Sequence, residues 1–537
     1  MTMPDPAVLR LAQAAATALA RRDHAGAEMA ARRLLALNPR DPNAHQVLGV
    51  IALDRGNAAA AKRAFEVADQ AAPNQPHILN GLGVALRRLE EADNARAAFT
   101  RAAELGLVDA WRNLGNLEAA EQRSSASIAA FERVLAHNPN DAVALAGLAH
   151  AHEQRHDLAR ATEYAAAALA REPGNEVAQL VLAHVKLRER DLTGAEAAAL
   201  PVTRGASKTN AAVAWGVIGE ARDKSGDTSG AFAAFTAANQ ALLAEHGALL
   251  NASHLLYHPD GVARMAALAE RVDVEAWTPK SGFATPAPVF LIGFPRSGTT
   301  LLDQILCAHP RLVCIEEREH FGRTLANAIP DPGKLARLAA LTADEIEAAR
   351  ADYWSRVKAD TKDWSEEQVL IDKLPLNIVV LPLIKRFFPD AKLILALRDP
   401  RDVILSCYQQ RFGINAAMVR FLDLNTSAEY YDRVMSLMEL ARRKLALELH
   451  EVRYERVVAD LEAEARALAE FIGVGFDPQM LDYRAKALAR EIGTPSARQV
   501  VQPLYTHSIS RWRRYQAQLE PVLPVLNPWA ERYGYSL

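Results

Sequence analysis

The sequence predicts a multidomain protein, with an N-terminal all-α superhelix of repeated helix pairs and a C-terminal α/β domain built on a central parallel sheet. Small and large apolar residues recur about every 34 residues through the first half of the chain. In the second half, short apolar strands alternate with helices, and a glycine-containing loop joins the first strand to a helix. With 537 residues, the chain is also too long for a single hydrophobic core.

The repeat is expected over residues 1–245, in about seven units. Units begin near residues 8, 42, 76, 108, 142, 176 and 212. Two of the clearest units are marked by Leu48, Gly49, Ala61, Phe65 and Ala68, and by Trp215, Ile218, Gly219, Ala231 and Phe235. Small residues let paired helices approach closely and large ones fill the seam between pairs, so stacking predicts a superhelix with a concave groove. The pattern resembles the tetratricopeptide family, which implies binding of a protein or peptide, or self-association. A plain spacer or dimerisation arm is the alternative.

Residues 246–287 lose this pattern and are rich in Gly and Pro, so we expect a linker there. Residues 288–537 then form the second domain. Strands are expected at 289–293, 312–315, 368–373, 392–399 and 448–457, with helices from 299, 400 and 461. Strands of continuous apolar character joined by helices predict a parallel sheet buried on both faces. Ligands of such sheets bind at the carboxyl ends of the strands.

The first anion site is predicted in residues 288–300, PVFLIGFPRSGTT. Gly293 and Gly298 allow a sharp turn that brings backbone N–H groups close to an anion at the start of the next helix. The spacing is that of a P-loop, but Thr299 stands where the loop of an NTPase has lysine. That lysine reaches the outer phosphates of a triphosphate. Its replacement favours a nucleotide whose reacting group lies directly beyond one 5′-phosphate, with Arg296 supplying the positive charge.

The second anion site is predicted where the strand KLILALR ends at Arg398. Ser406 lies eight residues later on the following helix, and an arginine beside a hydroxyl binds phosphate by charge-assisted hydrogen bonds. A surface turn with salt bridges is the alternative for this segment alone. Its place after a P-loop-like strand favours the phosphate site.

The ordered motifs PRSGTT and RDPRDV-x-x-S resemble the sulfotransferase family, and within it the tyrosylprotein sulfotransferases, over residues 288 to about 515. This resemblance implies 3′-phosphoadenosine 5′-phosphosulfate as the donor, with no metal. It implies a donor site made of Pro295, Arg296, Ser297, Gly298, Thr299, Thr300, Arg398, Ser406 and Tyr454.

The resemblance also implies a catalytic set of Glu317 as general base, Lys373, Arg296 and Ser496. The alternatives are a solvated helix-start glutamate, a surface lysine and a turn serine, and His320 is a rival base. Gln502 replaces a lysine of the family, which leaves donor contacts from that loop open. Residues 511–515, RWRRY, fit a stack on the adenine or a clamp on the 3′-phosphate as well as an ordinary helix with one buried Trp.

The composition of the chain argues against several classes of binding partner. The 62 basic and 65 acidic residues are mixed along the chain, which predicts neither a nucleic-acid binder nor a membrane-surface binder. No apolar run long enough for a membrane span occurs, and residues 1–26 lack the apolar stretch of a signal peptide. The three cysteines, Cys307, Cys314 and Cys407, have neither disulfide nor metal-ligand spacing, so we expect buried thiols in the cytoplasm and no metal site.

These observations predict a sulfotransferase that modifies an acceptor hydroxyl, with a peptide tyrosine favoured and the repeat groove holding the polypeptide. One alternative is sulfation of a carbohydrate or small molecule, with the repeats used for assembly into a homo-oligomer. The other is a non-catalytic repeat scaffold with a vestigial nucleotide site.

Overall fold

The computed structural model describes the chain except residues 1–5, 274–276, 278–282, 284, 319, 329–336, 362–363, 366 and 485–507. The chain divides into two compact units, Met1–Val202 and Thr203–Leu537. The boundaries expected at 245 and 287 stay a prediction. The seventh helix pair of the repeat pattern belongs to the second compact unit.

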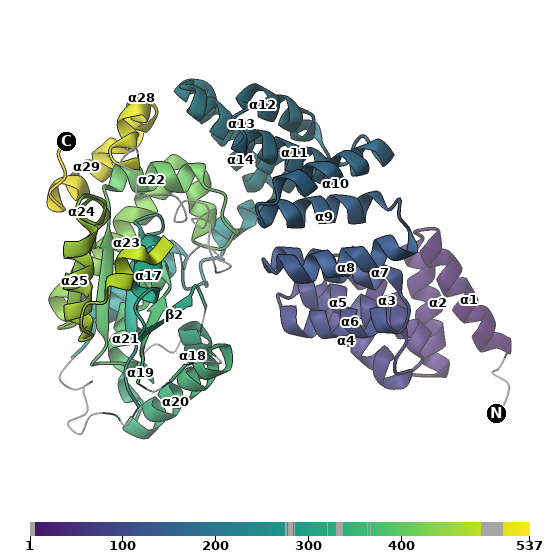
Figure 1. Cartoon of the computed structure of the whole chain (residues 1–537). Coiled ribbons are helices and arrows are strands. Elements are labelled where there is room, and N and C mark those ends of the chain that lie inside the picture. The colour runs from purple at the N-terminus through teal and green to yellow at the C-terminus, as the bar shows by residue number, and fades with distance from the viewer. Residues whose placement is uncertain are drawn as a thin grey trace. The chain divides into compact units, whose positions relative to one another are not determined.

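The first unit is all-α (Figure 1). Its helices are α1 (Pro6–Ala20), α2 (His24–Leu37), α3 (Pro42–Asp54), α4 (Ala58–Ala71), α5 (Pro76–Arg88), α6 (Ala92–Glu104), α7 (Val108–Ala120), α8 (Ser124–His137), α9 (Ala142–Gln154), α10 (Leu158–Arg171), α11 (Glu176–Arg188), α12 (Leu192–Ala199) and the 3₁₀ helix η1 (Leu200–Arg204). Many start at an Asp or Asn whose side chain accepts a backbone N–H of the first turn, as Asp41 does for α3 and Asp157 for α10. The starts of α3, α5, α7, α9 and α11 follow the predicted repeat positions.

The expected recurrence of small and large apolar residues explains how these helices pack. Phe65 of α4 is buried against Gly49 of α3 and Gly81 of α5, and a Cβ added at Gly81 would lie 2.5 Å from the Phe65 ring. Phe131 of α8 packs in the same way against Gly115 and Gly147. One aromatic ring therefore fills the seam between one helix pair and the next, and only a residue without a side chain lets the helices approach that closely.

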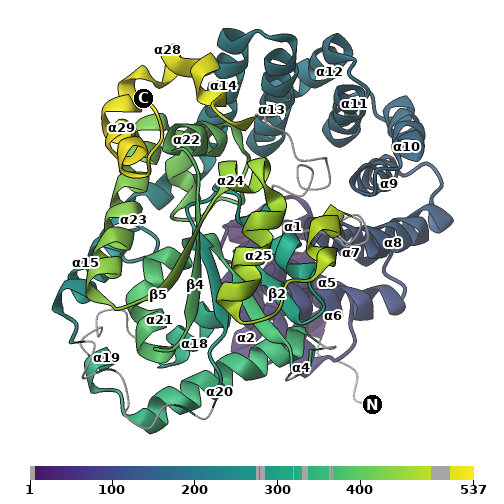
Figure 2. The ribbon, with the colours of Figure 1, turned by 60° about the vertical axis from the view of Figure 1, so that its left-hand side comes forward.

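The second unit carries the sheet (Figure 2). Its first half contains α13 (Lys208–Ser225), α14 (Thr228–His246), η2 (Gly247–Asn251), α15 (Pro259–Arg271), β1 (Val289–Gly293), α17 (Thr299–Cys307), β2 (Leu312–Glu316), α18 (His320–Ala328), α19 (Arg337–Ala340), α20 (Ala343–Asp360), β3 (Val369–Lys373), η4 (Pro375–Val380) and α21 (Leu381–Phe387). Its second half contains β4 (Lys392–Leu397), α22 (Pro400–Gln409), η5 (Met418–Leu422), α23 (Leu424–Lys444), β5 (Glu448–Arg453), α24 (Tyr454–Ala459), α25 (Leu461–Ile472), η6 (Pro478–Asp482), η8 (Arg511–Tyr515), α28 (Gln516–Leu519), η9 (Glu520–Val522) and α29 (Leu523–Arg532).

The strands form one five-stranded sheet in the order β2-β3-β1-β4-β5, and every pair is parallel. Successive residues of β1 enter different apolar clusters, because Phe290 packs with α20, α21 and α23 while Leu291 packs with α17 and α25. The central strands β3, β1 and β4 are therefore buried on both faces, as the continuous apolar strands predicted, whereas the edge strand β5 is mostly only partly buried.

Two elements differ from the expected ones. The strand expected over 448–457 ends at Arg453, and Tyr454 begins helix α24. The segment expected to be an irregular linker contains α15, which starts at Pro259, a residue favoured at the first helical position. Its buried residues Val262 and Met265 belong to the apolar cluster that includes α23. Among the described residues, none of the helices has the length and apolar character needed to cross a membrane.

Candidate functional site

Each of the five strands ends at a residue predicted to act in the site. The list, in sheet order, is Glu317 directly after β2, Lys373 at the end of β3, the loop 294–298 after β1, Arg398 directly after β4 and Tyr454 directly after β5. Because the strands are parallel, all five positions lie at one edge of the sheet. This is the edge where ligands of open α/β sheets bind.

The loop after β1 has the backbone of an anion cradle. Arg296 and Gly298 both have positive φ angles, 70° and 99°, and α17 begins at the next residue, Thr299. A Cβ added at Gly298 would lie 2.9 Å from Cδ2 of Tyr454, so the loop and the end of β5 approach as closely as a glycine allows. Because α17 begins directly after this loop, its N-terminus lies at the same edge of the sheet.

The two predicted anion motifs contact each other directly. Arg296 Nε donates to Ser406 Oγ of α22 at 2.9 Å, and Arg398 Nη1 donates to the carbonyl oxygen of Arg296 at 3.2 Å. The Cys407 thiol donates to the carbonyl oxygen of Pro295, and burial raises the pKa of this thiol. Loop and helix therefore form one continuous wall that carries both predicted sites.

Arg398 has further contacts and one open donor. Its Nη2 donates to the carbonyl oxygen of Ser508 at 2.7 Å, and its guanidinium lies 4.8 Å from the centre of the Tyr454 ring. The Tyr454 hydroxyl hydrogen-bonds Ser508 Oγ at 2.8 Å. Arg398 Nε is buried and has no hydrogen-bond partner among the described residues. A buried donor without a partner is costly, so this atom suits an anionic ligand.

The start of α22 is organised by two buried carboxylates. Asp399 caps the helix through the N–H of Arg401 and also forms an ion pair with the guanidinium of Arg401 at 2.7 Å. Asp402 accepts the backbone N–H groups of Ser510 and Trp512 at 2.8 and 2.7 Å, and burial raises its pKa to about 6. The role of Asp402 as an anchor for residues 510–512 was absent from the sequence reasoning, because no local pattern joins residues 108 or more positions apart.

Lys373 and Glu317 are held together across β2 and β3. Lys373 Nζ is fully buried and lies 2.9 Å from Glu317 Oε1 and 3.3 Å from Glu316 Oε1. Burial works to lower the pKa of Lys373, but the negative charges of Asp303, Glu317 and Glu316 outweigh it and the pKa is raised. The ammonium group therefore stays charged. The N–H of Glu317 donates to the carbonyl oxygen of Lys373 at 2.8 Å, at a φ of 51°.

Beside Lys373, sequence reasoning missed a buried acid. Asp372 is buried, accepts a hydrogen bond from the Tyr353 hydroxyl at 2.8 Å, and has its pKa raised to about 7 by burial. Its other oxygen, Oδ1, has no partner among the described residues. The segment QVLIDK showed an acid inside an apolar strand, which is the pattern that would have drawn attention to it.

The remaining candidates lie in different places. Ser496 and Gln502 fall outside the described residues. His320 Nε2 lies 3.1 Å from Asp360 at the end of α20, and burial lowers the pKa of His320. Trp512 of η8 is buried, with the guanidinium of Arg401 4.1 Å from the centre of its ring.

The cysteines form no disulfide. Cys307, Cys314 and Asp303 bring possible metal-ligand atoms within 4.8 Å of one another, in the part of the chain that the structure describes. The charge of Asp303 already acts on Lys373.

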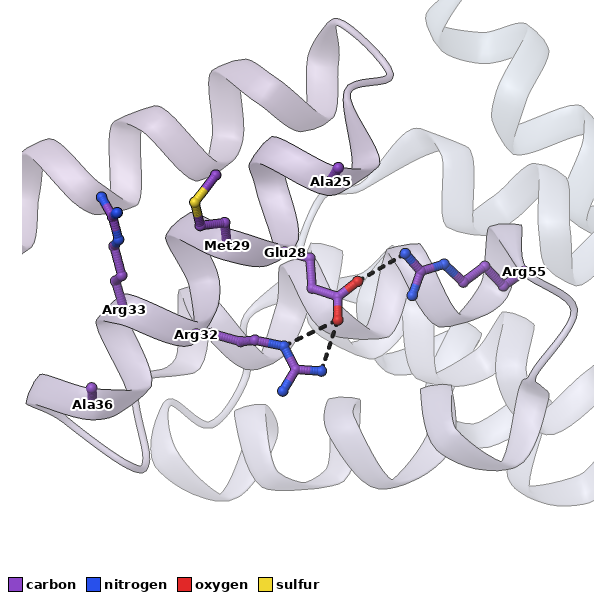
Figure 3. Close-up of a pocket in the computed structure, with 7 residues that line it drawn as sticks. All are labelled: Ala25, Glu28, Met29, Arg32, Arg33, Ala36 and Arg55. Carbon is purple, nitrogen blue, oxygen red and sulfur yellow. Dashed lines mark hydrogen bonds and ion pairs between the residues drawn. The ribbon is translucent and has the colours of Figure 1, made fainter.

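A surface hollow of about 520 Å³ occurs in the first unit (Figure 3). Its walls are Ala25, Glu28, Met29, Arg32, Arg33, Ala36 and Arg55. Figure 3 shows the carboxylate of Glu28 bound by Arg32 and Arg55, at 2.7 and 2.8 Å. The hollow contains none of the residues at the strand ends and has no base or nucleophile beside this paired glutamate. It is a surface with excess positive charge rather than a reaction site.

Comparison with known proteins gives a family for part of the chain. Residues 288–478 match the model of the sulfotransferase family. Protein-tyrosine sulfotransferase A of Caenorhabditis elegans is 25% identical over 275 residues, which are 48% of this chain and 69% of that protein. An uncharacterised protein of Aquifex aeolicus is 32% identical over 271 residues, 47% of this chain. The chain covers 35% of the length of that relative.

Among solved structures, a tetratricopeptide repeat protein from Parabacteroides merdae is similar with a TM-score of 0.37 and 16% identity, covering 44% of this chain and 93% of that one.

Proposed function

We propose that this chain, whose residues 288–478 match the model of the sulfotransferase family, moves a sulfuryl group from 3′-phosphoadenosine 5′-phosphosulfate to an acceptor hydroxyl. The observation that carries the proposal is the joined wall made by the loop after β1 and the Arg398–Ser406 motif after β4. It offers two anion sites on neighbouring strands, as a donor with phosphate groups at both ends of one adenosine requires.

The chemistry of the wall fits this donor. Residues 295–300 would hold the 5′-phosphosulfate with backbone N–H groups and the side chains of Arg296, Thr299 and Thr300. Arg398, Ser406 and Tyr454 would hold the 3′-phosphate. The Nε of buried Arg398 has no hydrogen-bond partner among the described residues and could donate to such an anion. When bound, the donor supplies an activated sulfuryl group whose leaving group is a phosphate.

The chain's own residues then supply base and charge. Glu317 is the proposed general base, which takes the proton of the acceptor hydroxyl. Lys373 holds this carboxylate at 2.9 Å and keeps its positive charge inside the protein, where charge that develops during transfer is stabilised most strongly. Arg296 adds a second cation on the other side of β3, from the loop after β1.

For the acceptor we propose the phenol of a peptide tyrosine. The support is the relationship to the protein-tyrosine sulfotransferase of C. elegans and the presence of a repeat array that can hold a polypeptide. The positively charged hollow on α2 favours a polypeptide with acidic residues.

Labelled donor, supplied with separate panels of tyrosine peptides and of glycans, tests the acceptor. We expect label in the peptides. Label found solely in glycans overturns the proposal of a peptide acceptor but agrees with a sulfotransferase. Calorimetry tests the enzyme itself. If the wild-type protein does not bind 3′-phosphoadenosine 5′-phosphate, the proposal of an enzyme is overturned in favour of a non-catalytic scaffold.

The donor site is tested by Arg398→Ala, which removes the open Nε and the contacts of its guanidinium. We expect affinity for 3′-phosphoadenosine 5′-phosphate to fall at least about tenfold, because a charged hydrogen bond is lost together with its Coulomb attraction. Unchanged affinity in calorimetry removes Arg398 from the donor site.

We also propose a cytoplasmic location, supported by three cysteines without a disulfide. Cell fractionation checks it, and recovery in an extracellular fraction overturns it. Homo-oligomer formation through the repeats is proposed as well. Light scattering at working concentration decides between an oligomer and a monomer.

A further inference from the structure

We propose that the helix pair α13–α14 positions the anion site of Arg398 and Ser406, and that Asp223 of α13 is its main positioning residue. This inference rests on the proposed function and assigns to the last helix pair of the repeat pattern a part in binding the 3′-phosphate. The pair belongs to the same compact unit as the sheet. It holds both segments that carry or close this anion site, residues 508–515 and α22.

Asp223 holds the segment around η8. Its carboxylate accepts a hydrogen bond from the Tyr515 hydroxyl at 2.6 Å and one from Arg511 Nη2 at 2.8 Å. Arg514 Nη2 lies 3.4 Å from the same carboxylate and donates to the backbone carbonyl of Asp223 at 3.1 Å. The side chain of Asp223 is only 13% exposed, and Tyr515 is fully buried. Two hydrogen bonds and an ion pair on one largely buried carboxylate fix η8 against the end of α13.

The segment held by Asp223 reaches Arg398 within a few residues. Ser510 has a φ of 56°, which is unusual for a serine, and its N–H and that of Trp512 bind Asp402 at the start of α22. Two residues earlier, Ser508 accepts from Arg398 Nη2 through its carbonyl and meets the Tyr454 hydroxyl through its own. The orientation of Arg398 therefore depends on where Ser508 lies.

The helix α14 makes the other contact with the site, through α22, the helix that carries Ser406. Tyr408 lies two residues after Ser406 on α22. Its hydroxyl is 2.8 Å from Thr236 Oγ1, and its carbonyl oxygen accepts from Asn239 Nδ2 at 3.0 Å. Phe232 stacks on the Tyr408 ring with centroids 5.1 Å apart. The last turn of α22 is thereby fixed to α14.

The contacts of α13 with residues 508–515 and of α14 with α22 explain why loss of Asp223 should weaken binding of the 3′-phosphate specifically. The loop after β1 is fixed by the strand before it and the helix after it, in the centre of the sheet. Residues 508–515 belong to no strand, and their described contacts with Asp223, Asp402 and Arg398 hold them at the site. Loosening Asp223 should therefore disturb the Arg398 side and leave the loop of residues 295–300 in place.

Asp223→Asn in the full-length chain tests this, with affinity measured by calorimetry for 3′-phosphoadenosine 5′-phosphate and for adenosine 5′-monophosphate. We expect the dissociation constant for the bisphosphate to rise about tenfold, equal to about 1.4 kcal/mol, and that for the monophosphate to stay unchanged. The matched control is Glu220→Gln, which removes an exposed carboxylate of α13 that pairs only one turn away with Lys224. It should bind both ligands as the wild type does.

Wild-type affinity of Asp223→Asn for the bisphosphate overturns the inference, and so does an equal loss for both ligands, which would show a general structural role. If Asp223→Asn does not fold by circular dichroism, Tyr515→Phe takes its place. This variant removes only the 2.6 Å donor and should weaken bisphosphate binding alone. A wild-type protein that does not bind the bisphosphate overturns the proposed function itself.

Discussion

Two site residues adopt a backbone conformation that non-glycine residues rarely use. Arg296 and Glu317 have φ angles of 70° and 51°. Such angles cost free energy and persist only where the surroundings impose them. At Glu317 this conformation is held by a hydrogen bond from its backbone N–H to the carbonyl oxygen of Lys373. The turn aims the carboxylate back at the Lys373 ammonium group, which supports Glu317 over an ordinary helix-start glutamate.

The neighbouring glutamates allow a direct test of the base. Both Glu316 and Glu317 contact Lys373, so each Gln variant removes one charge beside the same ammonium group. We expect Glu317→Gln to lower kcat by about 10²–10⁴-fold, the usual contribution of a general base, with unchanged affinity for 3′-phosphoadenosine 5′-phosphate. Glu316→Gln is the control and should keep kcat within about tenfold of the wild type. Single-turnover rates measure the difference, and the reverse ranking would make Glu316 the base.

Asp372 should make stability depend on pH. Its pKa is raised from 3.8 to about 7 in the folded protein, so the folded state holds this proton more tightly than the unfolded state. Its contribution to stability is complete below about pH 4 and is lost as the pH rises through about 7. Asp372→Asn, which cannot ionise, should therefore be more stable than the wild type at pH 8 by roughly 4 kcal/mol, and by much less at pH 4.

Urea unfolding at pH 4, 6 and 8, followed by tryptophan fluorescence, measures this difference. Asp482→Asn is the control, because it makes the same substitution at an exposed aspartate. A gain for Asp372→Asn that does not grow between pH 4 and pH 8 would contradict a raised pKa at Asp372.

At the scale of elements, the proposed role of the loop 294–298 depends on its backbone, and Gly298 is its tightest point. Gly298→Ala places a methyl group 2.9 Å from the Tyr454 ring in addition to the strain of a φ of 99°. We expect loss of affinity for 3′-phosphoadenosine 5′-phosphate of at least about tenfold, since loop and β5 must separate. Gly106→Ala is matched in backbone strain, with a φ of 93°, but has no atom within 4 Å of the added Cβ.

Thermal unfolding and calorimetry of both variants separate strain from contact. Gly106→Ala should lower the melting temperature and leave binding unchanged. Equal binding in Gly298→Ala and the wild type would show that the close approach of Tyr454 to the loop has no part in the site.

In the second unit, the strands and the helices that start at 299, 400 and 461 were predictable because their patterns are local. The strands at 289–293, 312–316, 369–373 and 392–397 are runs of apolar residues, and their place follows from the sequence alone, although the ends expected at 315, 368 and 399 differ slightly. The end of β5 was not predictable, since RYERVV suits either a strand or the helix α24 that forms. The helix α15 was not predicted, because its apolar residues are recognised as a buried face only when they are seen packed on the cluster that includes α23.

At the scale of the molecule, the boundary between the two compact units falls just before the helix pair α13–α14, at a place that the repeat pattern does not show. We expect a fragment of residues 203–537 to unfold in one cooperative transition and to bind 3′-phosphoadenosine 5′-phosphate with nearly full affinity. A fragment of residues 247–537 lacks Asp223, Thr236 and Asn239, and should lose most of that affinity. Circular dichroism and calorimetry compare the two, and equal binding by both would show that the helix pair is dispensable for the site.

The first unit should matter for long acceptors only. Removal of residues 1–202 is expected to raise KM for a protein acceptor while leaving KM for a short tyrosine peptide unchanged, because the array offers binding surface and none of the proposed catalytic residues. Steady-state rates with both acceptors decide, and an equal change for both contradicts a role in holding the polypeptide.

The sequence by itself determined the repeat, the parallel sheet and which segments form its strands, since helix seams, buried strands and phosphate loops depend on residues close together in the chain. Five strand ends at one edge of a sheet follow from that alone once the strands are parallel. Only the tertiary structure decided that Arg296 meets Ser406, that Lys373 lies buried between two glutamates, and that Asp223 holds η8. These contacts join residues from 56 to 292 positions apart, and such pairs are chosen by packing of the whole unit, which no local pattern encodes.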